Sequence, residues 1–171
     1  LQGDYQKHLE ILDAIEVKGI EVRFPEDFDK IDRLIIPGGE STVMAELLQR
    51  LKLRDRITAF AQTRPVWGTC AGMILLASEV NDATITPLGM IDIAVNRNGY
   101  GRQVFSTVIS SQLALNGTRE AFDLVFIRAP RVTRVGDGVK VLLKSGIDPV
   151  LLSQNNILVS SFHPELTGSV T

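Results

Sequence analysis

The sequence has 171 residues and a formal net charge of −2, and 44% of its residues are apolar while 22% are charged. This length and this balance are typical of one soluble globular domain with a sizeable core. Because the chain has no basic block and no apolar run of about 18 residues, it gives no indication of nucleic acid or of a membrane as a partner.

The first half of the chain alternates helix-like and strand-like segments. Tyr5, Leu9 and Leu12 recur near helical spacing and predict a helix over residues 4–16, which Gly19 ends. Ser41 or Thr42 is expected to cap the next helix. Strands are predicted over 20–24, 33–39 and 66–70, and further helices over 41–51, 54–62 and 71–78.

The second half is dominated by strand-like segments, over 91–95, 103–109, 122–128, 139–145, 149–154 and 157–163. Asn155 and Asn156 favour a tight hairpin between the last two, because asparagine tolerates positive φ. Helices that alternate with strands indicate a parallel sheet, and hairpins indicate an antiparallel addition. We therefore predict one α/β domain over residues 1–171, with a mostly parallel central sheet, helices on both of its faces and an antiparallel β extension.

The only cysteine of the chain lies in Gly68-Thr69-Cys70-Ala71-Gly72. This G-x-C-x-G pattern is that of a nucleophile elbow, a sharp turn from strand to helix that exposes the nucleophile, with Cys in place of Ser. A helix N-terminus at that point favours the thiolate, and the Ala71 N–H is available for a developing oxyanion. The alternative is a buried structural cysteine. One cysteine excludes an internal disulfide, and without a secretory signal the prediction is a cytoplasmic protein.

A cysteine nucleophile needs a base, and the chain has two histidines. His8 is expected to be a surface or helix-packing residue of the first helix. His163 precedes Pro164, which favours extended geometry, so His163 and Glu165 point to the same side. The carboxylate is then able to fix the tautomer of the imidazole. The alternative is a histidine at a strand end beside a solvated glutamate.

A second loop, "IIPGGEST" over 35–42, also leads from a strand end to a helix start. In an open α/β sheet, ligands gather outside the carboxyl ends of the strands, and Gly38 and Gly39 allow backbone N–H groups to face a ligand. The alternative is an ordinary turn with a capped helix. The loop lacks the P-loop pattern for nucleotides, and one Cys with two distant His gives no metal-ligand pair. We predict no metal and no cofactor.

The combination of a Cys elbow with "HPE" from His163 to Glu165 resembles the class I, triad-type glutamine amidotransferases. The stretches "LQGDYQKH", "PGGEST", "WGTCAGMILLA", "RNGYGRQ", "FIRAPR" and "SFHPEL", which run from residue 1 to residue 166, are together similar to the glutaminase subunits of pyridoxal 5′-phosphate synthases. The resemblance implies the flavodoxin-like amidotransferase fold. Such proteins usually carry a strand before "LQG" and a helix after "SFHPEL"; neither stands in this sequence, and we expect that both flanks were left out of it.

The resemblance also implies a role for particular residues. Cys70 would be the nucleophile, His163 the base and Glu165 the residue that orients His163, with an oxyanion hole from the N–H groups of Gly39 and Ala71. Both Arg97 and Arg128 suit the carboxylate of an amino acid, because a guanidinium binds it bidentately; the alternative for either is a surface ion pair. The substrate contacts implied by the family are Gly39, Glu40, Ser41, Arg97, Ile127 and Arg128.

The resemblance implies hydrolysis of L-glutamine to glutamate and ammonia through a γ-glutamyl thioester. The ammonia would pass to a pyridoxal 5′-phosphate synthase subunit in a hetero-oligomer, for vitamin B6 biosynthesis. One alternative is the glutaminase subunit of another amidotransferase such as imidazole glycerol phosphate synthase, against which "LQGD" and "RNGYGRQ" count. Others are a cysteine peptidase-like hydrolase and a non-enzymatic binding module with a structural or redox-sensitive thiol.

Overall fold

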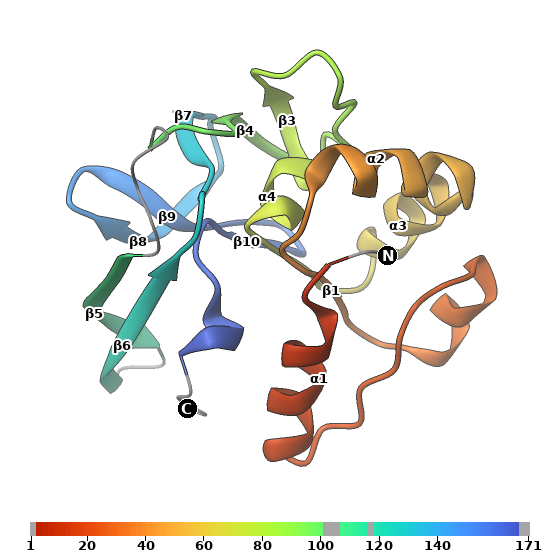
Figure 1. Ribbon diagram of the computed structural model, residues 1–171, viewed down its shortest axis with the longest axis horizontal. Helices are drawn as coiled ribbons and strands as arrows, with labels where there is room; N and C mark the ends of the chain where they lie inside the picture. The colour runs from red at the N-terminus through yellow and green to blue at the C-terminus, as the bar shows by residue number, and fades with distance from the viewer. Residues whose placement is uncertain (1–2, 101–106, 116–117, 168–171) are drawn as a thin grey trace.

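The computed structural model describes residues 3–100, 107–115 and 118–167. Its central sheet has five strands in the order β1-β2-β10-β9-β8. β2 pairs in parallel with β1 on one side and β10 on the other, whereas the β10–β9 and β9–β8 pairs are antiparallel (Figure 1). The mostly parallel arrangement that alternating helices and strands predicted is therefore present around β2. The bounds are β1 Leu34–Ile36, β2 Val66–Thr69, β8 Lys140–Ser145, β9 Asp148–Gln154 and β10 Ile157–Ser160.

Two smaller sheets form the β extension, whose pairs are antiparallel except that of β3 (Ala77–Val80) with β4 (Ile91–Asn96), which is parallel. The first has the order β3-β4-β7, from Ala77–Val80, Ile91–Asn96 and Arg131–Val135. The second is the hairpin of β5 (Thr107–Leu115) and β6 (Thr118–Phe126), which projects beside β8 and β9 (Figure 1). Both hairpin strands differ from the predicted ranges, and the predicted residues 103–106 lie outside the described part. β7 was not predicted, because its charged arginines hide the strand pattern of its valines.

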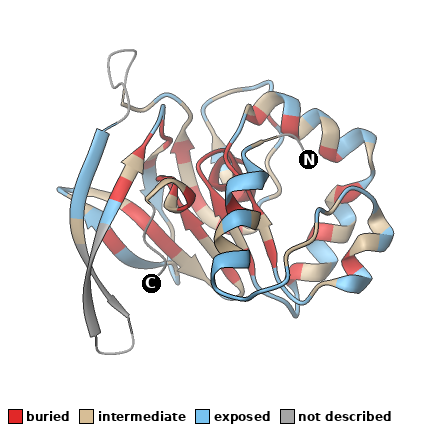
Figure 2. Cartoon of the chain, turned by 60° about the horizontal axis from the view of Figure 1, so that its bottom comes forward, coloured by how far each residue is buried: buried red, intermediate tan, exposed pale blue. Residues whose placement is uncertain are grey.

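Helices cover both faces of the sheet, as predicted. Successive residues of a strand point to opposite faces. A side chain at Gly68 would meet Gly72 and Leu76 of α4, whereas the neighbouring Thr69 hydroxyl lies 3.4 Å from Nε2 of His8 in α1. The helices are α1 Tyr5–Ala14, α2 Ser41–Arg50, α3 Leu53–Ala61 and α4 Ala71–Leu76, with 3₁₀ turns η1 at Pro25–Lys30 and η2 at Pro164–Leu166. Buried residues concentrate in the strands and in α4 (Figure 2).

Two local predictions about helix ends were wrong. The helix predicted over 71–78 ends at Leu76, and Ala77 begins β3. The cap of α2 is Glu40 rather than Ser41 or Thr42, because the Glu40 carboxylate accepts a hydrogen bond from the Val43 N–H at 3.2 Å. A carboxylate there satisfies a free N–H and interacts favourably with the helix dipole.

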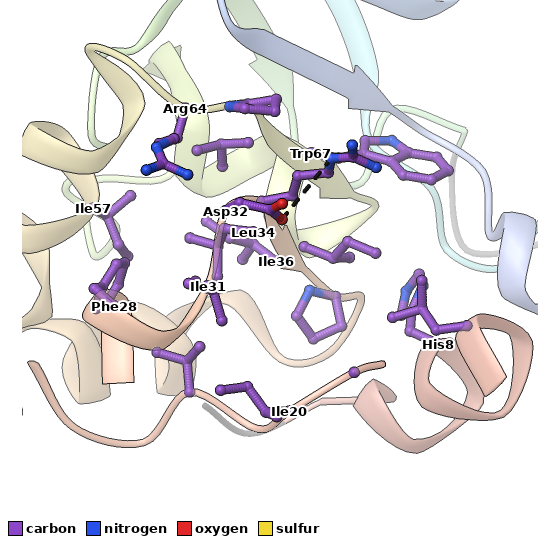
Figure 3. Close-up of a pocket in the computed structure, with 18 of the residues that line it drawn as sticks. His8, Ile20, Phe28, Ile31, Asp32, Leu34, Ile36, Ile57, Arg64 and Trp67 are labelled. Carbon is purple, nitrogen blue, oxygen red and sulfur yellow. Dashed lines mark ion pairs between the residues drawn. The ribbon is translucent and has the colours of Figure 1, made fainter. Parts of the chain in front are cut away.

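The strand predicted over 20–24 is not formed. Within the described part of the chain those residues pair with no strand, and a groove of about 1340 Å³ separates them from β1. Figure 3 shows Ile20 on one wall of this groove and Leu34 and Ile36 of β1 on the other, with His8 at one end. An isolated extended segment has no partner for its backbone groups, so apolar alternation alone does not make it a strand.

The turn between β9 and β10 agrees with the prediction. The two strands pair antiparallel from Gln154 and Ile157 onward, and Asn155 has a φ of 52°. This tight turn returns the chain into the centre of the sheet, where β10 lies next to β2. The residues that follow β2 and β10 are thereby placed side by side.

Candidate active site

Three loops converge at one edge of the central sheet. β1, β2 and β10 run parallel, so their carboxyl ends lie together. The Gly38–Gly39 loop follows β1, Cys70 follows β2, and His163 follows β10. The sequence motifs that are far apart in the chain therefore meet in space.

Cys70 sits in a strained turn between β2 and α4. Its φ of 47° and ψ of −102° lie in a region that side chains rarely adopt. Such strain persists only where the surroundings enforce it, and it is concentrated at functional sites. Here the Cys70 N–H donates to the Ser160 carbonyl of β10 at 2.8 Å. The side chain is 8% exposed, and its Sγ lies 3.9 Å from the carbonyl oxygen of Ile127.

The two glycines of the motif allow the elbow to pack tightly. A Cβ at Gly68 would stand 2.6 Å from the Gly72 backbone, and a Cβ at Gly72 would stand 2.1 Å from the Ile36 carbonyl of β1. Any side chain at either position would push α4 away from the sheet. The G-x-C-x-G pattern is thus a packing requirement of this turn.

His163 and Glu165 form a buried pair. Nδ1 of His163 lies 2.7 Å from Oε1 of Glu165, and both residues are more than 90% buried. Burial lowers the pKa of His163, but hydrogen bonds to Cys70 and Glu165 outweigh it and raise the pKa to about 10. The imidazole therefore lies between the sulfur and the carboxylate and is held in its charged form, which favours the thiolate of a neighbouring cysteine.

The backbone of the first loop packs directly on this histidine. A Cβ at Gly38 would stand 2.4 Å from Cε1 of His163. The Gly38 carbonyl accepts a hydrogen bond from the Asp4 N–H at 3.0 Å, so the segment before α1 also holds the loop. Gly39 comes next in the loop and is exposed, whereas Ala71 is buried directly after Cys70.

Glu40 and Arg97, both implied as substrate contacts, are paired with each other. An Nη2–H of Arg97 donates to Oε1 of Glu40, and Nη1 donates to Oδ2 of Asp82 at 2.9 Å. A hydrogen bond from the Thr42 hydroxyl lowers the pKa of the Glu40 carboxyl, and Arg97 lowers it further. The structure thus brings the end of the first loop and the segment after β4 together, and Ser41 is buried at the start of α2.

Ile127 and Arg128 reach the site from the end of β6. The Ile127 carbonyl faces Cys70, and Arg128 is exposed with a φ of 44°. His163 is tied to the same strand, because its N–H donates to the Val125 carbonyl at 2.8 Å. Within the described residues the Arg128 guanidinium makes no hydrogen bond or ion pair.

Sequence reasoning missed two residues at this site. His8 was expected at the surface or in helix packing, but it is 7% exposed and lies behind Glu165. Its position three residues after Tyr5, on the helix side that carries Leu12, was the available signal. Asp82 carries no motif, and its pairing with Arg97 becomes visible only in the folded chain.

Two kinds of feature are absent from residues 3–100, 107–115 and 118–167. No group of three or more His, Cys, Asp and Glu side chains there is arranged to hold a metal ion. None of the helices in this part of the chain has the length and apolar character needed to cross a membrane.

Comparison with known proteins gives a consistent set of relatives. The model of the SNO glutamine amidotransferase family matches residues 1–171. A protein of Francisella philomiragia named pyridoxal 5′-phosphate synthase subunit PdxT is 50% identical over 167 residues, which is 98% of this chain and 88% of that protein. A protein of the same name from Thermosipho africanus is 46% identical over 168 residues, again 98% and 88% of the two chains. A solved structure described as a glutamine amidotransferase superposes with a TM-score of 0.90 at 40% identity, covering 99% of this chain and 90% of the other.

Proposed function

The chain belongs to the SNO glutamine amidotransferase family, and on this premise we propose that it is the glutaminase subunit of a pyridoxal 5′-phosphate synthase. It hydrolyses L-glutamine to glutamate and ammonia and passes the ammonia to the synthase subunit, for vitamin B6 biosynthesis. The observation that carries the proposal is the junction of β2 and β10. There the strained Cys70, the charged His163 and the buried Glu165 lie next to one another in space, in that order.

In the first half of the reaction Cys70 acts as the nucleophile. Its thiolate adds to the side-chain amide carbon of glutamine, and the C=O π electrons move to the oxygen. The N–H groups of Ala71 and Gly39 stabilise this oxyanion. His163 then gives its proton to the amide nitrogen, the C–N bond breaks, and ammonia leaves a γ-glutamyl thioester on Cys70.

In the second half His163, now neutral, takes a proton from water. The hydroxide adds to the thioester carbon, the C–S bond breaks, and the γ-carboxylic acid that forms gives its proton to solvent as glutamate is released. Cys70 leaves as the thiolate and His163 keeps the proton that it took from water, so the site returns to its thiolate–imidazolium state. Glu165 keeps one tautomer of His163 and stabilises its charged form in both halves, because Oε1 is fixed at 2.7 Å from Nδ1.

The two arginines have different parts in substrate binding. Arg128 binds the α-carboxylate, supported by its exposed guanidinium beside the Cys70 loop. Arg97 is engaged by Glu40 and Asp82, so it shapes the Gly39–Ser41 loop and meets the substrate together with Glu40. The Ile127 carbonyl, which faces Sγ of Cys70, is placed to bind a group of the substrate near the reacting carbon.

The proposed partner is the synthase subunit, in a cytoplasmic hetero-oligomer. Ammonia diffuses away and is protonated at neutral pH, so a glutaminase that supplies a biosynthetic enzyme has to work in contact with it. Support comes from the two relatives, each named as a subunit of such a synthase.

A coupled assay tests the function. Glutamate release from glutamine is followed with the synthase subunit present, in the wild type and in Cys70→Ala. We expect release in the wild type and none in the variant, while both still co-purify with the synthase subunit. A binding module would lose nothing on this substitution, and a peptidase-like enzyme would cleave peptides or esters and leave glutamine intact. If glutamine hydrolysis were activated instead by the ammonia-accepting subunit of imidazole glycerol phosphate synthase, the chain would be assigned to that enzyme.

A further inference from the structure

His8 is a buried histidine that the reaction above does not use. It is the buried residue of α1, and its Nε2 lies 3.4 Å from Oε2 of Glu165 and 3.4 Å from Oγ1 of Thr69. The side chains of His8 and Glu165 are 8% and 0% exposed. The two groups therefore face each other in a site from which water is largely excluded.

The far oxygen of Glu165 needs such a partner. Oε1 is bound to His163, but Oε2 is fully buried and has no hydrogen bond of ordinary geometry within the described residues. A buried charged oxygen without a donor is costly. The Nε2 atom of His8 is the nitrogen that faces it, and it is shared with the Thr69 hydroxyl.

We propose that His8 is a positioning residue for glutamine hydrolysis, which donates its Nε2–H to Glu165 and extends the arrangement to Cys70–His163–Glu165–His8. The proposal rests on the function assigned above to Cys70. His8 holds the Glu165 carboxylate in the plane that suits Nδ1 of His163. It touches neither the substrate nor the reacting atoms.

The charge around His8 is consistent with a neutral donor. Burial lowers its pKa, Glu165 and Asp4 raise it, and the nearby charge of His163 lowers it again, with a net lowering. His8 is thus uncharged at neutral pH, and one ring nitrogen carries a proton. A neutral donor stabilises the carboxylate without adding a second positive charge beside His163.

α1 also links this donor to the first loop of the site. The Asp4 N–H, directly before the helix, donates to the Gly38 carbonyl at 3.0 Å, and Gly38 packs on the ring of His163. One short segment therefore supports His163 from two sides, through Glu165 and through Gly38. This placement explains why a helix at the margin of the sheet carries a buried histidine.

Removal of the donor should weaken the charged form of His163. Without the N–H, the Glu165 carboxylate is free to turn away from Nδ1 of His163, so it supports the imidazolium less. The thiolate–imidazolium pair then forms at higher pH. We expect the midpoint of Cys70 alkylation against pH to rise by about one unit in His8→Leu, and kcat for glutamine to fall about tenfold with KM within about twofold.

Two measurements on the full chain test this. The first is the rate of alkylation by iodoacetamide in buffers from about pH 5 to about pH 10, a range that spans the ordinary pKa values of His and Cys. It reports on Cys70 alone, because the chain has one cysteine. It requires neither glutamine nor the partner. Glutamine kinetics are then measured in the complex with the synthase subunit. His8→Gln, whose amide nitrogen stands near the place of Nε2, should restore most of the wild-type values.

Leu9→Ala is the matched control, since Leu9 lies on the same helix and lines the groove beside Gly19. It should lower stability and leave the alkylation midpoint unchanged. If His8→Leu does not fold, His8→Asn takes its place, because its amide is too short to reach Oε2. A folded His8→Leu or His8→Asn with wild-type midpoint and kcat overturns the proposal, and so does an equal loss in His8→Gln. Absence of glutamine hydrolysis in the wild type would instead overturn the proposed function.

Discussion

Gly38→Ala is the sharpest test of how the first loop fixes the base. The substitution adds one methyl group to a buried residue whose φ lies outside the left-handed region, so the backbone itself accepts alanine. The methyl would stand 2.4 Å from Cε1 and 3.1 Å from Nδ1 of His163. The ring has little freedom to move, because its Nδ1 is bound to Glu165 at 2.7 Å.

The magnitude follows from that overlap. To bring Cε1 from 2.4 Å to the 3.4 Å of an ordinary contact, the ring or the loop has to move by about 1 Å. A misplacement of about 1 Å costs roughly 10²-fold in rate, which is about 2.7 kcal/mol of activation free energy. Overpacking of a rigid site costs about 1–3 kcal/mol of unfolding free energy. We expect kcat to fall about a hundredfold with a smaller loss of stability.

The assay is glutamine hydrolysis in the presence of the synthase subunit, together with urea unfolding of each variant. Gly136→Ala is the control, because its methyl would stand 1.9 Å from Oδ2 of Asp92, between β7 and β8 and away from Cys70. It should lose stability and keep its kcat. A folded Gly38→Ala with wild-type kcat would show that the loop does not determine where His163 lies.

Three further changes test other parts of the site. Glu40→Gln removes the charged cap of α2 and the partner of Arg97. Urea unfolding should show that the free energy of unfolding falls by about 1 kcal/mol, and the KM for glutamine should rise. An unchanged KM would show that this loop does not take part in substrate binding. Arg128→Met should raise KM for glutamine about tenfold or more with kcat nearly unchanged, and an effect confined to kcat would contradict its role as the carboxylate contact. NMR titration should show that His163 keeps its proton to a pH of about 10. In Glu165→Gln the proton should be lost at lower pH, because one of the hydrogen bonds that raise the pKa of His163 is gone. Identical titrations of the two proteins would contradict the pairing.

Much of the fold was predictable because its strongest signals are local. Helical periodicity placed α1, α2 and α3 within two residues, and the Asn155-Asn156 turn fixed the β9–β10 hairpin. The predictions that failed concern segments whose structure depends on residues far away in the chain. Residues 20–24 have the composition of a strand, but a strand exists only when a neighbour pairs with it, and none of the residues that the structure describes does so. β7 shows the reverse case, since pairing with β4 makes a strand of a segment with a weak pattern.

The site was predictable where chemistry restricts the residue type. A nucleophile elbow requires Gly68 and Gly72, and an extended His-Pro-Glu places His163 and Glu165 on one side. His8 and Asp82 escaped because their roles depend on which distant residue they face. A histidine on a helix can have many structural roles, and the spacing of residues in the sequence does not show that it is buried against a carboxylate.

The parallel pairing of β2 with β10 has a consequence for synthesis on the ribosome. Trp67 and Ser160 lie in these two strands, 93 positions apart in the chain. The cysteine loop emerges long before the strand that delivers its base, and non-local pairings of this kind form late. Under the function proposed above, the Cys70 thiol of a nascent chain stays without its base, and glutamine is not hydrolysed, until β10 has inserted beside β2.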